Sequence, residues 1–353
     1  MKIAIAGAGI MGRVLALSLM QAGHHISLFD QDTKQGQNSC SFAAAGMLAP
    51  MMELEKSPEL IYQLGLDALT QHWPHLLAQL SRPVYFQKQG SLLLAHPNDQ
   101  AALTHFISIL DRKIKQLSYQ YLDKQSLSSF EPALQHFSQA YHFPIDGQIN
   151  SQGLLQALEF ELVKYTDWYE LQEVITVSPH QIKTKDRIHH FDLVFDCRGM
   201  GGREYFSELY GVRGELIYLH APEVNLTRPI RFIHPRYPLY IVPRPHHHYL
   251  IGASEIIAND NSPISVRSTL ELLTAAYYLN AGFAEARLVK SMTQIRPSLA
   301  NHLPLIKYTD GLVAINGLYR HGYLITPTLV NDILNWLNAD ISKVKYSQIW
   351  EKI

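Results

Sequence analysis

The sequence predicts an α/β protein that combines a nucleotide-binding unit with a second, β-rich part. Three observations support this fold class. A β-α-β pattern with spaced glycines occupies residues 2–29, short apolar segments recur at 191–197 and 312–316, and three strand-like segments follow one another within 214–254. Short apolar runs next to glycine are typical of buried parallel strands, and closely spaced strands are typical of antiparallel sheets.

The N-terminal pattern is that of a Rossmann-type fold. We expect a strand over Lys2–Ala6, a helix over Gly12–Gln21 and a second strand over His25–Phe29. Asp30 ends the second strand, 18 residues after Gly12. An acidic side chain there is placed to accept hydrogen bonds from a ribose hydroxyl.

A G-x-G-x-x-G motif lies between the first strand and the helix. Gly7 permits the tight turn, Gly9 lets the backbone approach a pyrophosphate, and Gly12 lets helix and strand pack closely. Ile10 and Met11 lie at the helix N-terminus, which attracts negative phosphates. The motif fits NAD and FAD equally.

The remaining elements alternate between helices and strands. Ser57 is expected to cap a helix whose first residue is Pro58. This helix is expected to run to about residue 80. Further helices are expected at 98–117, 147–165 (after a loop), 270–281 and 328–337. Strands are expected at 84–95 (a pair broken at Gln89–Gly90), 191–197, 214–220, 239–243, 249–254 and 312–316.

Composition excludes several classes of protein. The 353 residues are 47% hydrophobic and 17% charged, with a net charge of -1, so the basic face that nucleic acids require is not expected. No stretch reaches the roughly 20 apolar residues of a membrane span. Cys40 and Cys197 are far apart in sequence, so we expect no disulfide framework and no metal site, and we expect a cytoplasmic location.

A run of small residues follows the second strand. Residues 41–50 read Ser-Phe-Ala-Ala-Ala-Gly-Met-Leu-Ala-Pro. Taken alone, this is a tightly packed loop. Together with this run, however, the chain resembles the D-amino acid oxidase superfamily. Within that superfamily it most resembles the glycine oxidases of thiamine biosynthesis, and residues 41–50 match their flavin-contacting loop. The resemblance covers nearly the whole chain.

Four further segments match this family in the correct order. They are 196–199 (Asp-Cys-Arg-Gly), 240–244 with 252–254 (Tyr-Ile-Val-Pro-Arg and Gly-Ala-Ser), 295–297 with 303–306 (Ile-Arg-Pro and Leu-Pro-Leu-Ile), and 317–324 (Gly-Leu-Tyr-Arg-His-Gly-Tyr-Leu). The resemblance implies FAD as cofactor. The relatives that bind flavin covalently do so through a cysteine; the last third of this chain has none, which implies non-covalent binding.

The resemblance also implies which residues contact FAD. Besides the N-terminal motif and Asp30, they are Ala43, Ala44, Ala45, Gly46, Met47, Cys197, Gly199, Arg296, Gly317, Tyr319, Arg320, His321, Gly322, Tyr323 and Leu324. It implies a discontinuous FAD-binding domain at 1–80, 144–210 and 286–353, and a substrate domain at 81–143 and 211–285.

Three residues are expected to serve catalysis. Taken alone, Arg296 is more typical of a structural arginine; the resemblance makes it the clamp for a substrate carboxylate. Tyr240, alone equally a core aromatic, could donate a second hydrogen bond to that carboxylate. Arg320, alone a solvated loop charge, could stabilise reduced flavin or help bind the carboxylate. Glu255 could face the substrate amine, although glutamate at a hairpin end is usually solvated.

The sequence departs from the glycine oxidases at several positions. Leu318 and His321 replace a usual histidine and asparagine, Asn301 replaces an aspartate, Arg198 stands where alanine is frequent, and Pro238 stands where a polar residue is expected. These departures concern the substrate more than the cofactor.

The expected activity is FAD-dependent oxidation of glycine or another small amino acid or amine. The products would be an imine, then a 2-oxo acid and ammonia, with O2 reduced to H2O2, in thiamine thiazole biosynthesis. Two alternatives remain: an amine dehydrogenase that uses another electron acceptor, and a flavin-bearing accessory protein. His246, His247 and His248 are expected to form a polar turn rather than a metal site, because neighbouring side chains on a hairpin alternate sides. An oligomer is possible.

Overall fold

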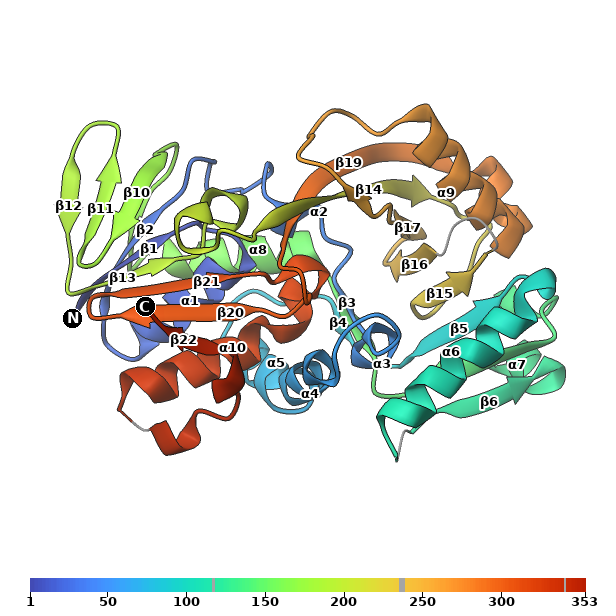
Figure 1. Cartoon of the computed structure of the whole chain (residues 1–353). Helices are drawn as coiled ribbons and strands as arrows, with labels where there is room; N and C mark the ends of the chain where they lie inside the picture. Colours follow the sequence, from blue (N-terminus) through green and yellow to red (C-terminus); the bar gives the residue numbers. More distant parts are fainter. Residues whose placement is uncertain (116–117, 235–238, 340) are drawn as a thin grey trace.

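The structure is a computed structural model that describes residues 1–115, 118–234, 239–339 and 341–353. Within these ranges the strands form two large and two small sheets. The two large sheets lie in opposite halves of an elongated molecule (Figure 1). Pro238, a position singled out above, lies outside the described residues.

The first large sheet confirms the predicted Rossmann-type unit. It has seven strands in the order β22-β20-β21-β13-β1-β2-β9. Neighbouring strands run parallel except β20 and β21. Their bounds are β1 (Lys2–Ala6), β2 (His25–Phe29), β9 (Asp167–Tyr169), β13 (Leu193–Asp196), β20 (Leu305–Thr309), β21 (Leu312–Asn316) and β22 (Trp350–Lys352).

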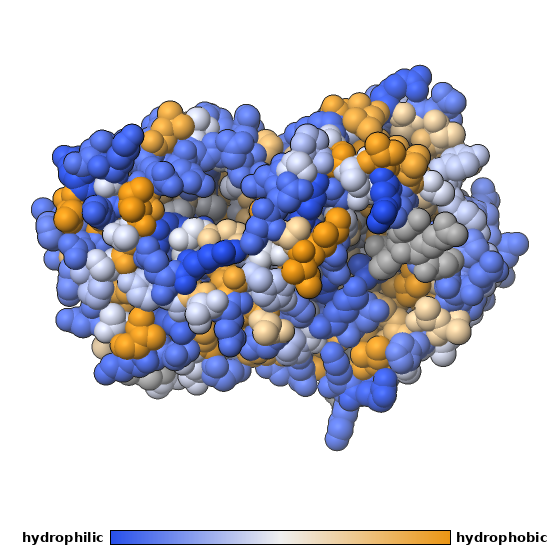
Figure 2. All heavy atoms as spheres, turned by 45° about the horizontal axis from the view of Figure 1, so that its top comes forward, coloured by the Kyte–Doolittle hydropathy of each residue, from blue (hydrophilic) through white to orange (hydrophobic). Residues whose placement is uncertain are grey.

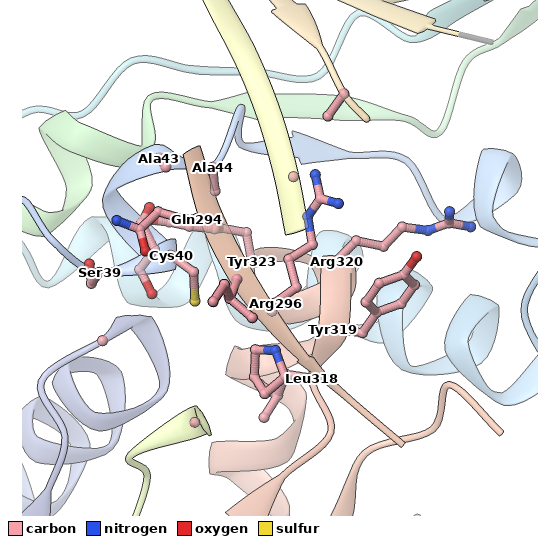
Figure 3. A pocket seen from close by; sticks show the side chains of 18 of the residues that line it. Ser39, Cys40, Ala43, Ala44, Gln294, Arg296, Leu318, Tyr319, Arg320 and Tyr323 are labelled. Carbon is pink, nitrogen blue, oxygen red and sulfur yellow. The ribbon is translucent and has the colours of Figure 1, made fainter. Parts of the chain in front are cut away.

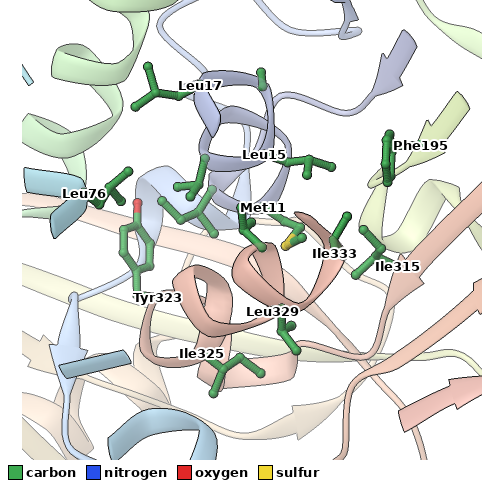
Figure 4. Close-up of a cluster of buried hydrophobic side chains, with 14 of the residues drawn as sticks. Met11, Leu15, Leu17, Leu76, Phe195, Ile315, Tyr323, Ile325, Leu329 and Ile333 are labelled. Atoms are coloured by element: carbon green, nitrogen blue, oxygen red, sulfur yellow. The ribbon is translucent and has the colours of Figure 1, made fainter. Parts of the chain in front are cut away.

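Both faces of this sheet are buried. Ile3 and Ile5 of β1 pack in a cluster with three contacting helices, α1 (Ile10–Gln21), α8 (Ser151–Leu162) and α10 (Gly322–Leu337). Figure 4 shows Leu15 and Met11 of α1 packed against residues of α10. The alternate residues of β1 face a small sheet of β10 (Val174–Ser178), β11 (Gln181–Thr184) and β12 (Ile188–His190).

Helix α10 begins earlier than predicted. The sequence suggested a helix at 328–337, but α10 begins at Gly322. A proline inside a helix lacks the N–H of the usual backbone hydrogen bond. In the structure Pro327 lies inside α10, and it cannot donate the usual hydrogen bond to Tyr323 O. The Nε1 atom of Trp73 donates to that oxygen instead, at 3.2 Å. A side chain from a distant helix thus satisfies the carbonyl that the proline leaves free.

The second large sheet confirms the predicted β-rich part and is mostly antiparallel. Its order is β18-β14-β17-β16-β15-β5-β7-β6, and β19 also pairs with β14. Only β15 and β5 run parallel among these pairs. The bounds are β5 (Ser91–Ala95), β6 (Gln120–Asp123), β7 (Gln139–Phe143), β14 (Tyr210–His220), β15 (Ile230–Ile233), β16 (Leu239–Arg244), β17 (His248–Gly252), β18 (Ile256–Ile257) and β19 (Arg287–Ser298).

The predicted strand pair at 84–95 is wrong. β4 (Phe86–Gln87) pairs with β8 (Gly147–Ile149), in a small sheet that also holds β3 (Met47–Leu48), whereas β5 pairs with β15 and β7. All five residues of β5 are buried. A strand buried on both faces needs neighbours on both edges, and a local hairpin cannot supply them.

Most predicted helices are present with shifted ends. The first continues from α4 (Glu59–Asp67) through a π-helical segment (Ala68–His72) into α5 (Trp73–Ala78). It begins after Pro58 and has no side-chain cap, so the predicted cap at Ser57 is wrong. Two other predicted helices are α6 (Gln100–Lys113) and α9 (Val266–Leu279). The structure also contains three short helices, α2 (Cys40–Ala43), α3 (Pro50–Glu53) and α7 (Lys124–Phe130). The predicted helix at 98–117 ends with two residues that lie outside the described ones.

The division into two domains stays a prediction, with one observation that bears on it. β19 was expected in the FAD-binding domain, but it runs along β14 in the second sheet. Its C-terminal end then leads to β20 of the first sheet. This strand therefore connects the two large sheets.

A buried carboxyl group lies where the two halves meet. Asp146, just before β8, accepts hydrogen bonds from Ser91 Oγ at 2.6 Å and from Met51 N at 3.5 Å. Its side chain is fully buried, no cation of the described residues is paired with it, and burial raises its pKa to about 8. At neutral pH this carboxyl group therefore retains its proton.

No helix in the described ranges combines the length and apolar character needed to cross a membrane. On the face drawn in Figure 2, apolar side chains occur in small separate groups among hydrophilic ones.

Candidate active site

A cavity of about 1000 Å³ lies between the two large sheets. In Figure 3, Cys40 and Ala44 lie on one side of it and Tyr319 and Arg320 on the other, with Arg296 between them. Most of the predicted site residues line it: Gly7, Gly9, Ile10, Met11, Asp30, Ala43, Ala44, Ala45, Gly46, Met47, Cys197, Gly199, Tyr240, Arg296, Tyr319, Arg320, Gly322 and Tyr323.

Four predicted site residues do not line the cavity. A Cβ atom at Gly12 would overlap the backbone of Gly7, so this glycine allows the predicted close packing of helix and strand. Leu324 is buried in the core. Gly317 lies against Leu303 O, and His321 is buried behind the wall.

The glycine motif is shaped for close backbone approach. Gly7 has a φ of +98°, and a Cβ atom there would lie 2.5 Å from Cys197 O. Gly9 is the N-cap of α1, and the first turn of that helix contains no acidic residue. The positive end of α1 thus meets the cavity with no acidic side chain in its own first turn, which favours binding of a pyrophosphate.

Asp30 lies where a ribose is expected. Its carboxylate accepts hydrogen bonds from Ala8 N at 2.5 Å and Asp32 N at 2.7 Å, which fix its orientation. Burial raises its pKa despite these two bonds. A carboxylate held in this way has acceptor capacity left for hydroxyl groups.

The small-residue loop is held from behind. Ser151 Oγ donates to Ala44 O at 2.6 Å, and the buried guanidinium of Arg244 donates to Ala45 O and, at 2.8 Å, to Ile149 O. Gly46 has a φ of +67°, and a Cβ atom there would overlap Ile149 O. The loop therefore presents a pre-shaped surface of small side chains, which fits a flat ring system. Together with the glycine motif and Asp30, these residues fit FAD.

Arg296 reaches the cavity from β19. Its Nη1 atom donates to Ser254 O at 3.2 Å, which is its one hydrogen bond within the described part of the chain. A Cβ atom at Gly214 would collide with the guanidinium, so this glycine provides the space for it. The remaining donors are free to bind an anion.

Tyr240 lies on β16 in the same wall. Its hydroxyl group makes no hydrogen bond to any described residue and lines the cavity. Burial raises the pKa of this phenol, although the charge of Arg296 opposes the shift. Tyr240 is therefore a neutral hydrogen-bond donor.

Arg320 is held by two carboxylates that the sequence reasoning did not assign to it. Its Nε atom donates to Glu53 Oε2 at 2.7 Å, and its Nη1 atom donates to Glu255. Glu255 is also paired with Lys56 at 3.2 Å. Burial opposes ionisation of Glu255, but Arg320 and Lys56 outweigh it and lower its pKa to about 2. Glu255 is thus a poor proton acceptor.

His321 lies behind this network in the protein interior. Its Nδ1 atom lies 3.3 Å from Glu53 Oε2, and its Nε2 atom lies 3.3 Å from Ser57 Oγ. Burial lowers its pKa to about 4, so the ring is neutral at pH 7. Glu53 follows the small-residue loop by only a few residues, and this proximity was the one available sign of its role.

Among the described residues no group of three or more His, Cys, Asp and Glu side chains could hold a metal ion. His246 and His247 form the turn between β16 and β17 with φ values of +62° and +54°, and His248 begins β17, which confirms the predicted turn.

Comparison with known proteins agrees with this geometry. The chain is 31% identical to a putative thiamine biosynthesis oxidoreductase of Rhizobium etli over 94% of this chain and 95% of that protein. It is 27% identical to a glycine oxidase of Geobacillus kaustophilus over 92% and 89%. The crystal structure of glycine oxidase from that organism superposes with a TM-score of 0.81 at 23% identity, covering 96% of this chain and 94% of that one.

The family model described as FAD dependent oxidoreductase matches residues 2–329, nearly the whole chain. That match takes in the glycine motif, the small-residue loop and Arg296. The cofactor is therefore FAD, and this chain belongs to the DAO family of FAD-dependent oxidoreductases.

Proposed function

We propose that this enzyme oxidises the amine of a small amino acid to the imine and passes the electrons to O2, giving H2O2. One observation carries the proposal. Arg296 offers unused donors beside Tyr240, in the same cavity as the glycine motif. A guanidinium with free donors binds a carboxylate through two parallel hydrogen bonds.

The residues of the chain act mainly by positioning the substrate. Arg296 binds the carboxylate, and the protonated hydroxyl group of Tyr240 donates a second hydrogen bond to it. Arg320 supports the wall through Glu53 and Glu255. FAD, when bound, supplies a two-electron acceptor for the Cα–H bond. Correct orientation can lower the barrier of such a step by several kcal/mol.

Glu255 is unsuited to act as a general base for the substrate amine. Glu255 lines the cavity but is paired with two cations, and its pKa is about 2. The amine must therefore arrive unprotonated. The rate of oxidation is expected to rise with pH as the amine of the free substrate loses its proton.

Two kinds of relative support a more specific role. One relative is named a thiamine biosynthesis oxidoreductase and another a glycine oxidase. We therefore place thiamine biosynthesis first among the pathways and include glycine among the small amino acids to be tested. FAD is expected to be held non-covalently.

Peroxide release tests the proposal. Purified FAD-loaded protein is incubated with glycine, N-methylglycine and a series of D-amino acids, and H2O2 is measured. Peroxide with at least one of them is the expected result. Bleaching of the flavin under anaerobic conditions without peroxide in air would indicate a dehydrogenase. No bleaching by any amine would indicate an accessory protein.

A further inference from the structure

A second arginine lies in the wall that carries Tyr240. Arg231 of β15 is paired in register with Tyr240 of β16, and both residues line the cavity. Residues directly opposite on neighbouring strands point to the same face of a sheet. The guanidinium of Arg231 therefore projects from the cavity side of the sheet.

The register across the sheet relates this arginine to Arg296. Tyr240 is paired with Gly252, Gly252 with Leu216, and Leu216 with Met292 of β19. Arg296 is four residues beyond Met292, so its side chain points to the same face. Arg231 and Arg296 consequently approach the cavity from two sides of Tyr240.

The hydrogen bonding of Arg231 is incomplete. Its nearest carboxylate is Glu55, with Nη2 and Oε2 at 3.5 Å, well beyond the 2.7–2.9 Å of a strong charge-assisted bond. Its Nε atom is buried and has no partner among the described residues. The side chain is only 15% exposed, so water cannot fully replace the missing acceptor. Arg320, by contrast, donates to two carboxylates.

We propose that Arg231 binds a second carboxylate of the substrate, so that the preferred substrates are amino acids with two carboxylate groups. This inference rests on the proposed function. The second carboxylate could belong to the side chain, as in aspartate, or to a substituent on the nitrogen, as in iminodiacetate. Glycine has no group that would reach Arg231.

Flavin reduction under anaerobic conditions tests the inference. The bimolecular rate constant of reduction is compared for D-aspartate against D-alanine, and for iminodiacetate against N-methylglycine. The first ratio reports a side-chain carboxylate and the second a carboxylate on nitrogen. At least one ratio is expected to exceed ten in the wild type.

Three variants and one control locate the effect. Arg231→Gln should lower that ratio at least tenfold, and Arg231→Lys should restore part of it. Glu55→Gln should raise it, because Glu55 competes for the guanidinium. Arg287→Ala removes an arginine whose side chain is 75% exposed and should leave the ratio unchanged. The flavin absorbance spectrum confirms that each variant has folded.

Two results would each refute a different claim, one the inference about Arg231 and the other the proposed function. If the monocarboxylates reduce the flavin and neither ratio exceeds ten, or if Arg231→Gln leaves the ratios unaltered, the inference is wrong and the proposed function stands. If no amino acid reduces the flavin, the proposed function itself fails.

Discussion

Replacement of Asp146 by asparagine should stabilise the protein, and the gain should grow with pH. Asp146 is buried between the two halves without a cation, and its pKa is raised to about 8. The asparagine side chain has nearly the same shape. Its amide can donate to Ser91 Oγ and its oxygen can accept from Met51 N, so both contacts persist. The variant removes the titration while keeping the packing.

The magnitude follows from the two pKa values. The ordinary pKa of aspartate is 3.8, so between pH 4 and 7 the unfolded chain is ionised while the folded protein keeps the proton. Because the folded-state pKa is raised, wild-type stability falls as pH rises through this window, by about 1.4 kcal/mol per pH unit. Three pH units amount to about 4 kcal/mol.

Thermal unfolding provides the assay. For 353 residues, an unfolding entropy of about 2.1 cal/mol/K per residue gives about 0.7 kcal/mol/K, so 4 kcal/mol raises Tm by about 5 °C. Wild type and Asp146→Asn are compared by circular dichroism at pH 4.5, 6, 7 and 8 with saturating FAD. Asp186→Asn, at an exposed position, is the control and should match the wild type.

The pH dependence of the difference is the critical observation. A Tm difference that stays constant between pH 4.5 and 8, or that shrinks as pH rises, would show that Asp146 is ionised in the folded protein. The assignment of a retained proton would then be refuted.

Three further predictions concern other residues. Arg296→Lys should weaken amino acid binding by about 10- to 100-fold without loss of FAD, because a point charge replaces a two-pronged donor; an unchanged dissociation constant in an anaerobic flavin titration would contradict the clamp. Trp73→Phe should lower the free energy of unfolding by about 1–3 kcal/mol in a denaturant titration, because Tyr323 O loses its hydrogen-bond donor. Trp350→Phe is the control and should lower it less, because the Nε1 atom of Trp350 has no partner in the described ranges. His321 has a lowered folded-state pKa of about 4, so wild-type stability should fall by about 3 kcal/mol as pH drops from 6.5 to 4, and the His321→Asn curve should be flatter there by that amount.

Local sequence signals predicted the parts of the fold that local interactions determine. The glycine spacing placed β1, α1 and β2 within two residues of their observed bounds. The sequence pattern gave wrong predictions where residues far away in the chain determine the structure. The apolar run in β5 and the glycine before it resemble a hairpin, but the partners of β5 come from residues 139–143 and 230–233. The predicted helix began only after Pro327, whereas α10 contains this proline, because a donor from distant Trp73 has no local signal.

The same distinction applies to the site. The positions that contact backbone or phosphate follow from glycine and small-residue motifs, and the resemblance located Arg296 and Tyr240. The pairing of Arg320 with Glu53 and Glu255 joins three separate segments and has no local signature. The cavity-facing position of Arg231 follows from strand register, which a single sequence does not specify.

The strand order of the seven-stranded sheet has a consequence for the synthesis of the protein. β1 lies beside β13, which lies beside β21, so the surroundings of the first glycine loop are incomplete until about residue 320 has left the ribosome. At about 5–20 residues per second, the first glycine loop waits roughly 15–65 s until its surroundings are complete. The complete FAD site therefore exists only on a nearly finished chain. The concentration of FAD in the cell then affects completed molecules, because FAD binding shifts the equilibrium from partly folded to folded forms.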